Sequence, residues 1–188
     1  MYNQKKMKIT FLAVFILSFN ISTYSQAESV IFKRVIDDYV LKYRQPNIKY
    51  SSTTLIILEK PLYLRKLELN DFSRFKEKYK KFDENTFVDF IARNQDNFHI
   101  ENDKYSDIDI IIVSQKQSKN RKELFAKYPN WNGSILEFSN IGFNERNDQA
   151  FLYYGFDSGS GTGGGFYIVF EKKKNNWKEK VVVPAWAT

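Results

Sequence analysis

The sequence predicts an α+β fold, with helices in the N-terminal half packed on a mostly antiparallel sheet that ends in a C-terminal four-stranded meander. Two observations predict it. Helical spacing of apolar residues stops near residue 130, and all eight glycines fall between Gly133 and Gly165. A run of helices followed by a run of strands is typical of this class. With 188 residues, of which 43% are hydrophobic, the chain is too apolar for disorder and suits one globular domain.

The first 27 residues have the layout of a Sec-type signal peptide. Three lysines precede an apolar run over residues 9–21, and small or polar residues lead to a cleavage site after Ala27. The run is shorter than a membrane span needs, so no stable span is expected after cleavage. We therefore expect a single α+β domain over residues 28–188, exported to a periplasm or to the medium. Removal of the leader leaves 26 bases against 22 acids.

The N-terminal half predicts helices and one early strand. Apolar residues at helical spacing indicate a helix over Ser29–Tyr43, and TTLIIL at Thr53–Leu58 is typical of a short buried strand. Further along, aromatic residues recur at intervals of three and four, which places them on one helical stripe. They are Phe72, Phe75, Tyr79 and Phe82.

A second helical face follows from Asp83, which has the character of an N-cap, through Phe87 and Phe90 to Phe98. The isoleucine-rich run Asp107–Val113 then indicates a strand. Asn120 and Glu123 form a capping-box pattern for a short helix over Arg121–Tyr128, which Pro129 closes.

The C-terminal part predicts strands at hairpin spacing. They are Ser134–Ile141, Ala150–Phe156, Gly165–Glu171 and Trp177–Val183. Turn residues occupy 144–149, 158–164 and 173–176, which favours an antiparallel meander. Pro184 is expected to end the last strand.

Few residues are suited to catalysis or metal binding. There is no cysteine, which excludes disulfides, zinc ribbons and thiol chemistry, and the only histidine is His99. The acidic run that follows His99 lacks the central glycine and the spacing of a calcium loop. We expect no metal and no cofactor. The enzyme alternative is a hydrolase or other small-molecule enzyme with a pocket between helices and sheet, using His99 or a carboxylate from Asp103 to Asp109 as base.

The glycine-rich stretch Gly159–Gly165 does not have the pattern of a phosphate-binding loop. A P-loop requires Lys and Ser or Thr followed by a helix, whereas this stretch leads into the strand sequence FYIVF. It predicts a flexible hairpin loop, because glycine tolerates positive φ. A loop that grips a substrate or a partner is the other interpretation.

Aromatic residues make up 12 of the last 58 residues, and both alternating sets along the second strand of the meander are apolar. Rings on the face away from the helices would suit a protein, peptide or glycan of the cell envelope. The residues assigned to this contact region are Tyr154, Tyr167, Gly161, Gly163 and Trp177. Closure of that face by the N-terminal segment or by sheet curvature is the alternative.

Charge is segregated along the chain. Lys60–Lys81 holds eight bases against three acids, and Asp83–Asp109 holds eight acids against two bases. Pairing between the two segments inside the protein is one use of this pattern. Contact of the basic helix with an anionic surface such as lipid headgroups is another, whereas export argues against nucleic acid.

The last 60 residues resemble the closing segment of small exported bacterial proteins of unassigned function, in which an S-x-[IV]-G-F-N turn precedes an A-x-x-Y strand, a Gly-rich hairpin and a final Trp. The matching residues include Ser139, Gly142, Phe143, Asn144, Ala150, Tyr153 and Trp186. The resemblance implies a fold element, not an activity. The order of helices and strands is also similar to that of nuclear-transport-factor-2-like domains, without the catalytic Asp and His placements of their enzymatic members. We therefore expect an exported, non-enzymatic binding module.

Overall fold

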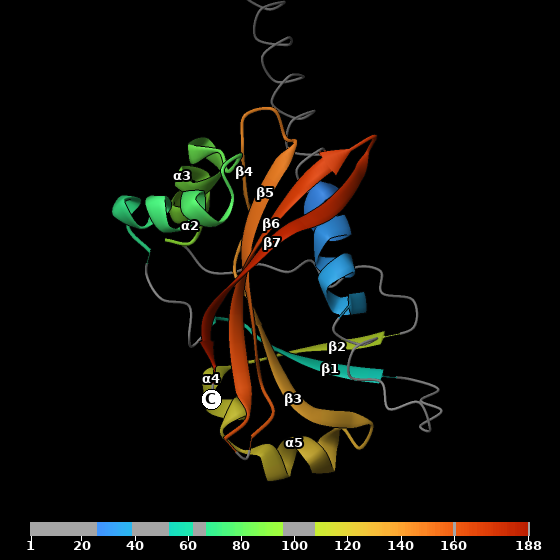
Figure 1. The fold of residues 1–188 in the computed structure, drawn as a ribbon. Helices are drawn as coiled ribbons and strands as arrows, with labels where there is room; N and C mark the ends of the chain where they lie inside the picture. Colours follow the sequence, from blue (N-terminus) through green and yellow to red (C-terminus); the bar gives the residue numbers. More distant parts are fainter. Residues whose placement is uncertain (1–25, 39–52, 62–66, 96–107, 160, 188) are drawn as a thin grey trace, which may run out of the picture. The chain divides into compact units, whose positions relative to one another are not determined.

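The structure is a computed structural model that describes residues 26–38, 53–61, 67–95, 108–159 and 161–187 (Figure 1). The chain divides into two compact units, Met1–Pro46 and Asn47–Thr188. In the first unit a helix covers residues 26–38, with ion pairs Lys33–Asp37 and Arg34–Asp38 one turn apart. The predicted leader up to residue 25, the end of the first predicted helix, Phe98 and His99 lie outside the described residues.

The second unit is built on a mixed sheet of seven strands in the order β2-β1-β3-β5-β6-β7, with β4 paired to β5. The strands are β1 (Thr53–Leu58), β2 (Ile108–Val113), β3 (Trp131–Phe138), β4 (Gly142–Phe143), β5 (Gln149–Asp157), β6 (Gly163–Lys173) and β7 (Asn176–Ala187). β1 is parallel to β2 and β3, and the other pairings are antiparallel. This confirms the predicted α+β class and the C-terminal meander.

The helices of this unit are short. They are η1 (Leu69–Asp71), α2 (Phe72–Lys78), α3 (Glu84–Arg93), α4 (Gln115–Ser118) and α5 (Arg121–Lys127). The side chain of Asp83 caps α3 by accepting from the amide of Asn85, and that of Asn120 caps α5 by accepting from the amide of Glu123. Both predicted N-caps are therefore confirmed, whereas α4 was not predicted.

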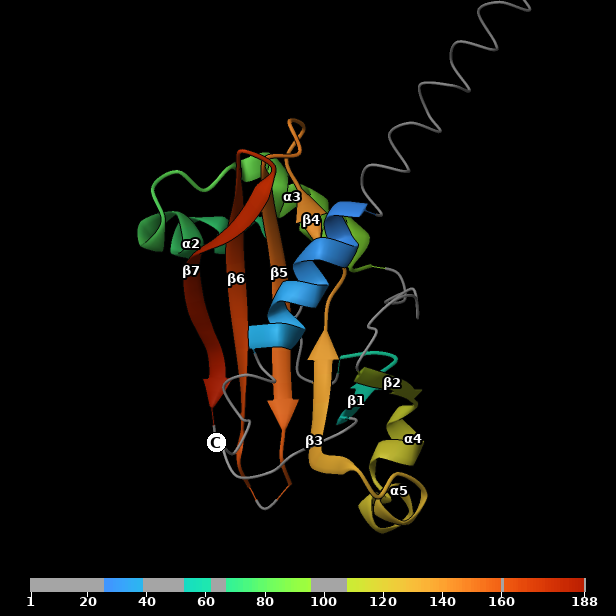
Figure 2. The same cartoon turned by 90° about the vertical axis from the view of Figure 1, so that its right-hand side faces the viewer.

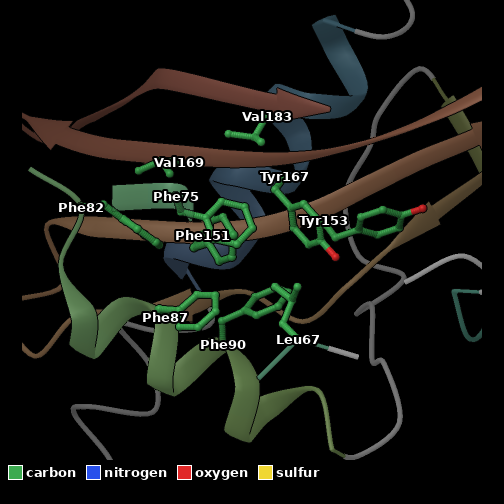
Figure 3. Packing of buried hydrophobic residues seen from close by; sticks show 10 residues of the cluster. All are labelled: Leu67, Phe75, Phe82, Phe87, Phe90, Phe151, Tyr153, Tyr167, Val169 and Val183. Carbon is green, nitrogen blue, oxygen red and sulfur yellow. The ribbon is translucent and has the colours of Figure 1, made fainter. Parts of the chain in front are cut away.

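Aromatic rings fill the space between α2, α3 and the strands β5 to β7 (Figure 3). The ring of Phe151 lies 5.0 Å from that of Phe75 and 4.8 Å from that of Phe90, in edge-to-face arrangements that favour aromatic pairs. We call this set the aromatic cluster. Its members are Leu67, Phe75, Phe82, Phe87, Phe90, Phe151, Tyr153, Tyr167, Val169 and Val183.

The aromatic stripe predicted for one helix is divided between a helix and its connection. α2 ends at Lys78, and Tyr79 has the extended backbone angles φ −140° and ψ 98°. Phe82 nevertheless reaches the aromatic cluster, where it is fully buried. A continuous helix from 70 to 82 is therefore wrong, although the stripe correctly identified residues that share one core.

A second cluster lies where α5 packs against the parallel strands. Its buried members are Ile56, Leu58, Val113, Leu124, Trp131 and Ile135. The side chains from Leu55 to Leu58 are all buried, which is typical of a central strand covered on both faces. We call this set the parallel-strand cluster.

The last strand is longer than predicted, because Pro184 does not end it. β7 continues to Ala187, and its register with β6 shifts between Gly165 and Phe166, opposite Pro184. Within the described sheet β7 is a terminal strand, where a missing backbone N–H is tolerated.

Candidate functional site

The two tyrosines predicted to bind a partner lie on opposite faces of the sheet. The β5–β6 register pairs Tyr153 with Tyr167 and Tyr154 with Phe166. Because side chains alternate along a strand, Tyr167 faces the helices, in the aromatic cluster, and Tyr154 faces away. The expectation that both rings share one open face is therefore wrong.

Neither tyrosine presents an open ring. Tyr167 is 2% exposed and Tyr154 is 9% exposed. The ring centroid of Tyr154 lies 5.7 Å from that of Phe138 and 6.2 Å from that of Phe166. Packing within the sheet therefore already uses both rings, and their contribution to binding stays a prediction.

The glycine-rich stretch is part loop and part strand. Gly161 lies in the connection with φ +75°, and no atom lies within 4 Å of the position its Cβ would take. Gly163 begins β6, where a Cβ would lie 2.8 Å from the carbonyl oxygen of Phe156 and 3.1 Å from the ring of Trp186. The predicted loop is therefore too long at its end, because Gly163 to Gly165 pair with β5.

Arg121 fixes the start of this loop. Its guanidinium donates to the carbonyls of Gly133 and Asp157, the latter at 3.0 Å, and forms an ion pair with the Asp157 carboxylate at 3.0 Å. The other carboxylate oxygen of Asp157 accepts from the amide of Gly159 at 2.7 Å. The first glycine of the stretch is thus held by α5 and β5.

Trp177 is buried at 5% exposure. Its ring packs edge-on against Phe143 at 5.9 Å, and the ammonium of Lys172 lies 5.7 Å from the ring centroid. The lysine covers an aromatic surface that was predicted to contact a partner.

The candidate base His99 and its acidic neighbours up to Asp107 lie outside the described residues. Asp109 is exposed on β2. Within the ranges that the structure describes, no group of three or more His, Asp and Glu side chains is placed to hold a metal ion. The enzyme alternative built on these residues stays a prediction.

The turn motif behind the resemblance holds α3 to the sheet. The amide of Asn140 donates to the side-chain oxygen of Asn94 at 2.9 Å, and the Asn94 side chain donates back to the Asn140 carbonyl at 3.1 Å. A Cβ on Gly142 would collide with the backbone of Phe90. The amide of Phe143 donates to Asp89 at 2.8 Å. The motif residues therefore build a helix–sheet contact.

A polar group that the sequence reasoning missed lies at the edge of the aromatic cluster. Glu137 on β3 is 1% exposed and pairs with Gly155 of β5. Trp186 donates its indole N–H to the hydroxyl of Tyr153 at 2.9 Å. Burial raises the pKa of Tyr153. The hydrogen bond from Trp186 lowers this pKa, whereas the charge of Glu137 and its hydrogen bond with the phenol raise it further. A lone acid inside the apolar strand SILEF was the signal for this group.

Two glycines make room for this group. A Cβ on Gly155 would lie 2.6 Å from the Tyr153 hydroxyl, and one on Gly165 would lie 2.7 Å from it and collide with the indole of Trp186. The Tyr153 hydroxyl and the Trp186 indole therefore pack directly against the backbone of these two glycines. The Glu137 carboxylate and the Tyr153 phenol thus lie together as a buried acidic pair.

A second missed feature is a surface rich in lysine, formed by residues 74–81 of α2 and its connection and residues 171–180 of the β6–β7 hairpin. The first segment has five bases and one acid, and the second has five bases and two acids. Together they carry a net charge of +7, whereas the chain without its predicted leader carries +4. We call it the lysine-rich surface. Its bases are Arg74, Lys76, Lys78, Lys80, Lys81, Lys172, Lys173, Lys174, Lys178 and Lys180.

Two contacts join α2 and its connection to the β6–β7 hairpin, and the second of them joins the two segments of this surface. Near the start of α2 the guanidinium of Arg74 donates to the carbonyl of Pro184 at 3.3 Å, and past its end the hydroxyl of Tyr79 donates to Glu171. Burial, followed by the hydrogen bond and the charge of Glu171, raises the pKa of Tyr79. α2 consequently packs against β7 and crosses its direction, as Figure 2 shows.

The tip of the β6–β7 hairpin belongs to the same end of the sheet as the α2–α3 connection (Figure 2). The amide of Lys172 donates to the carbonyl of Asp148 at 2.8 Å, and the Gln149 side chain donates to the carbonyl of Lys81 at 3.0 Å. Lys173 pairs with Asn176, so the turn consists of two exposed residues, Lys174 and Asn175.

Comparison with known proteins returned no match to a family model, to a curated protein or to a solved structure. Among the described residues, no helix is long and apolar enough to cross a membrane.

Proposed function

We propose that the chain is an exported binding protein that contacts an anionic partner of the cell envelope through its lysine-rich surface, rather than an enzyme. The observation that carries the proposal is the net charge of +7 on two segments that the contact of Tyr79 with Glu171 brings together. Such a surface attracts anions over about a Debye length, ~8–10 Å at physiological salt.

The described acids of the segment that follows form no ion pair with these bases. Of its described acids, Asp83 caps α3 and Asp89 forms an ion pair with Arg93 at 2.8 Å. In the described part of the chain no ion pair joins Lys60–Lys81 to Asp83–Asp109. The exposed side chains of Lys78, Lys80 and Lys81 are placed to meet an external partner.

The test is retention of the exported protein on cells. Intact mass measurement first establishes the N-terminus, for which the leader predicts cleavage after Ala27. Wild-type protein should remain with the envelope fraction at low salt and leave it at high salt, because screening weakens contacts between exposed charges. The variant Lys78→Glu/Lys80→Glu should be released already at low salt.

A matched control is Lys119→Glu/Lys122→Glu, which reverses two exposed lysines of the α4–α5 region. It should be retained like wild type, because it leaves the lysine-rich surface intact. Equal retention of both double variants, or retention of wild type that salt does not change, would contradict the proposal.

Glu137 and Tyr153 favour a second candidate, a small-molecule enzyme between helices and sheet. A buried carboxylate costs free energy unless it is paired, so its presence in an apolar strand is compatible with an acid–base role. Glu137→Gln keeps the shape and removes the base. On the binding proposal this variant keeps salt-sensitive retention, whereas loss of a turnover detected in a substrate screen would favour the enzyme.

A further inference from the structure

The tip of the β6–β7 hairpin has a backbone conformation that does not suit its residue. Lys174 has φ +48° and Asn175 has φ +63°. Positive φ at both central residues is the pattern of a type I′ turn, which favours Asn, Asp or Gly at both positions. A lysine Cβ is strained there, because it approaches the following carbonyl oxygen.

The register of the hairpin explains why the turn lies at this position, but not why it contains a lysine. A shift by one residue would centre the turn on Asn175 and Asn176, which accept positive φ, and would turn the buried Trp177 to the other face. The burial of Trp177 thus fixes the register. Asparagine or glycine at position 174 would keep this register without the strain.

We propose that the hairpin tip, with Lys173 and Lys174, is the point at which the protein contacts its partner, and that this partner is the anionic phospholipid surface of a membrane. The inference rests on the proposed function and names the partner class. Strained residues that persist in a fold cluster at ligand-binding sites, and Lys174 is such a residue at an exposed, charged position.

The composition of the lysine-rich surface favours a lipid surface over a partner with individually recognised groups. Nine of its ten bases are lysine and only Arg74 is arginine. Arginine provides the planar, bidentate geometry for single phosphates or carboxylates, whereas lysine acts as a point charge that suits a diffuse anionic layer.

The aromatic residues of the same segments argue against single-stranded nucleic acid. Base recognition needs exposed rings for stacking. Phe75 and Trp177 are buried, and Tyr79 packs against the aromatic cluster. The hairpin tip and the neighbouring α2–α3 connection instead present charged lysines without exposed rings on which bases could stack.

The experiment compares vesicle binding and stability in three variants of the exported protein, used with the N-terminus that mass measurement defines. Lys174→Asn removes the charge and relieves the strain, and Lys174→Gln removes the charge and keeps the strain. Lys122→Gln removes a charge from an exposed position on α5 as the control. Sedimentation with phosphatidylcholine vesicles, with and without phosphatidylglycerol, measures binding.

Wild type should bind only the vesicles that contain phosphatidylglycerol, and less at high salt. Both Lys174 variants should bind about fivefold more weakly, the effect of one lysine near an anionic surface. Lys174→Asn should also raise Tm by roughly 2–4 °C, because the turn is relaxed, whereas Lys174→Gln should not. The control should change neither quantity.

Vesicle binding by Lys174→Gln at the wild-type level would overturn the contact at the tip, and the proposed function would stand if Lys78→Glu/Lys80→Glu still lost retention on cells. Wild-type binding to inorganic polyphosphate but not to anionic vesicles would overturn the membrane as partner while leaving an anionic partner. Absence of salt-sensitive retention on cells would instead refute the proposed function.

Discussion

The aromatic cluster and the parallel-strand cluster both pack helices against the sheet, but they use different side chains. The first joins α2 and α3 to antiparallel strands through rings that meet edge to face, as Phe75 and Phe151 do at 5.0 Å. The second joins α5 to parallel strands through aliphatic side chains and one indole. Each buried aromatic ring contributes more packing energy than each branched aliphatic side chain, so fewer residues carry the stability of the aromatic cluster.

The comparison predicts its largest effect at Phe151. Its ring contacts rings from α2, α3 and β6, and it is fully buried. Phe151→Ala should destabilise the fold by about 3–5 kcal/mol. Chemical denaturation monitored by circular dichroism measures this, and a loss below that of Leu124→Ala would break the contrast between the clusters.

Leu124→Ala tests the parallel-strand cluster. Leu124 is 5% exposed on α5 and contacts side chains from the parallel strands. The loss should be about 2–3 kcal/mol, in the lower part of the range for leucine truncation, because the short helix can move toward the cavity. The same denaturation experiment applies, with the exposed Ala126→Gly, which carries only the helix-propensity cost, as control.

Gly165→Ala tests whether the missing side chain at position 165 provides the space that the Tyr153 hydroxyl and the Trp186 indole occupy. The added methyl would meet the indole of Trp186 and lie 2.7 Å from the Tyr153 hydroxyl. Overpacking should cost about 1–3 kcal/mol and shift the fluorescence of Trp186. Gly161→Ala has open space and only the strain of φ +75°, so it should leave the fluorescence unchanged.

The smallest expected effect concerns alkaline pH. Tyr79 and Tyr153 have pKa values raised above the ordinary 10.0. The folded state holds these protons more tightly than the unfolded state, so their contribution is present below pH 10.0 and decreases as the pH rises above it. Tyr79→Phe should therefore lose less stability between neutral and alkaline pH than wild type. Equal losses in the variant and in wild type would show that Tyr79 does not contribute to the alkaline loss of stability.

Sequence patterns predicted the parts of this fold that depend on local spacing. The strand at Thr53–Leu58 and the N-caps Asp83 and Asn120 are confirmed residue by residue. The spacing of Phe75 and Phe82 identified core positions, but it could not reveal that the helix ends between them, because an extended connection can place a ring in the same core.

The candidate sites were harder to predict, because they depend on pairing between distant residues. The sequence shows lysines at 76–81 and at 172–180, but only the contact of Tyr79 with Glu171 places the two segments together. Tyr154 and Tyr167 were assigned to one face, and the β5–β6 register separates them. The burial of Glu137 likewise depends on the register of β3 with β5.

The place of β1 in the sheet has a consequence for how the chain folds. β1 is the first strand along the part of the chain that the structure describes, yet it lies between β2 and β3, whose residues begin at 108 and 131. A growing chain therefore carries the apolar segment TTLIIL without either partner until most of the sequence has been made. Long-range parallel pairing of this kind forms slowly and leaves hydrophobic segments exposed in the meantime. Residues 53–58 are therefore the segment that a chaperone would be expected to bind during synthesis.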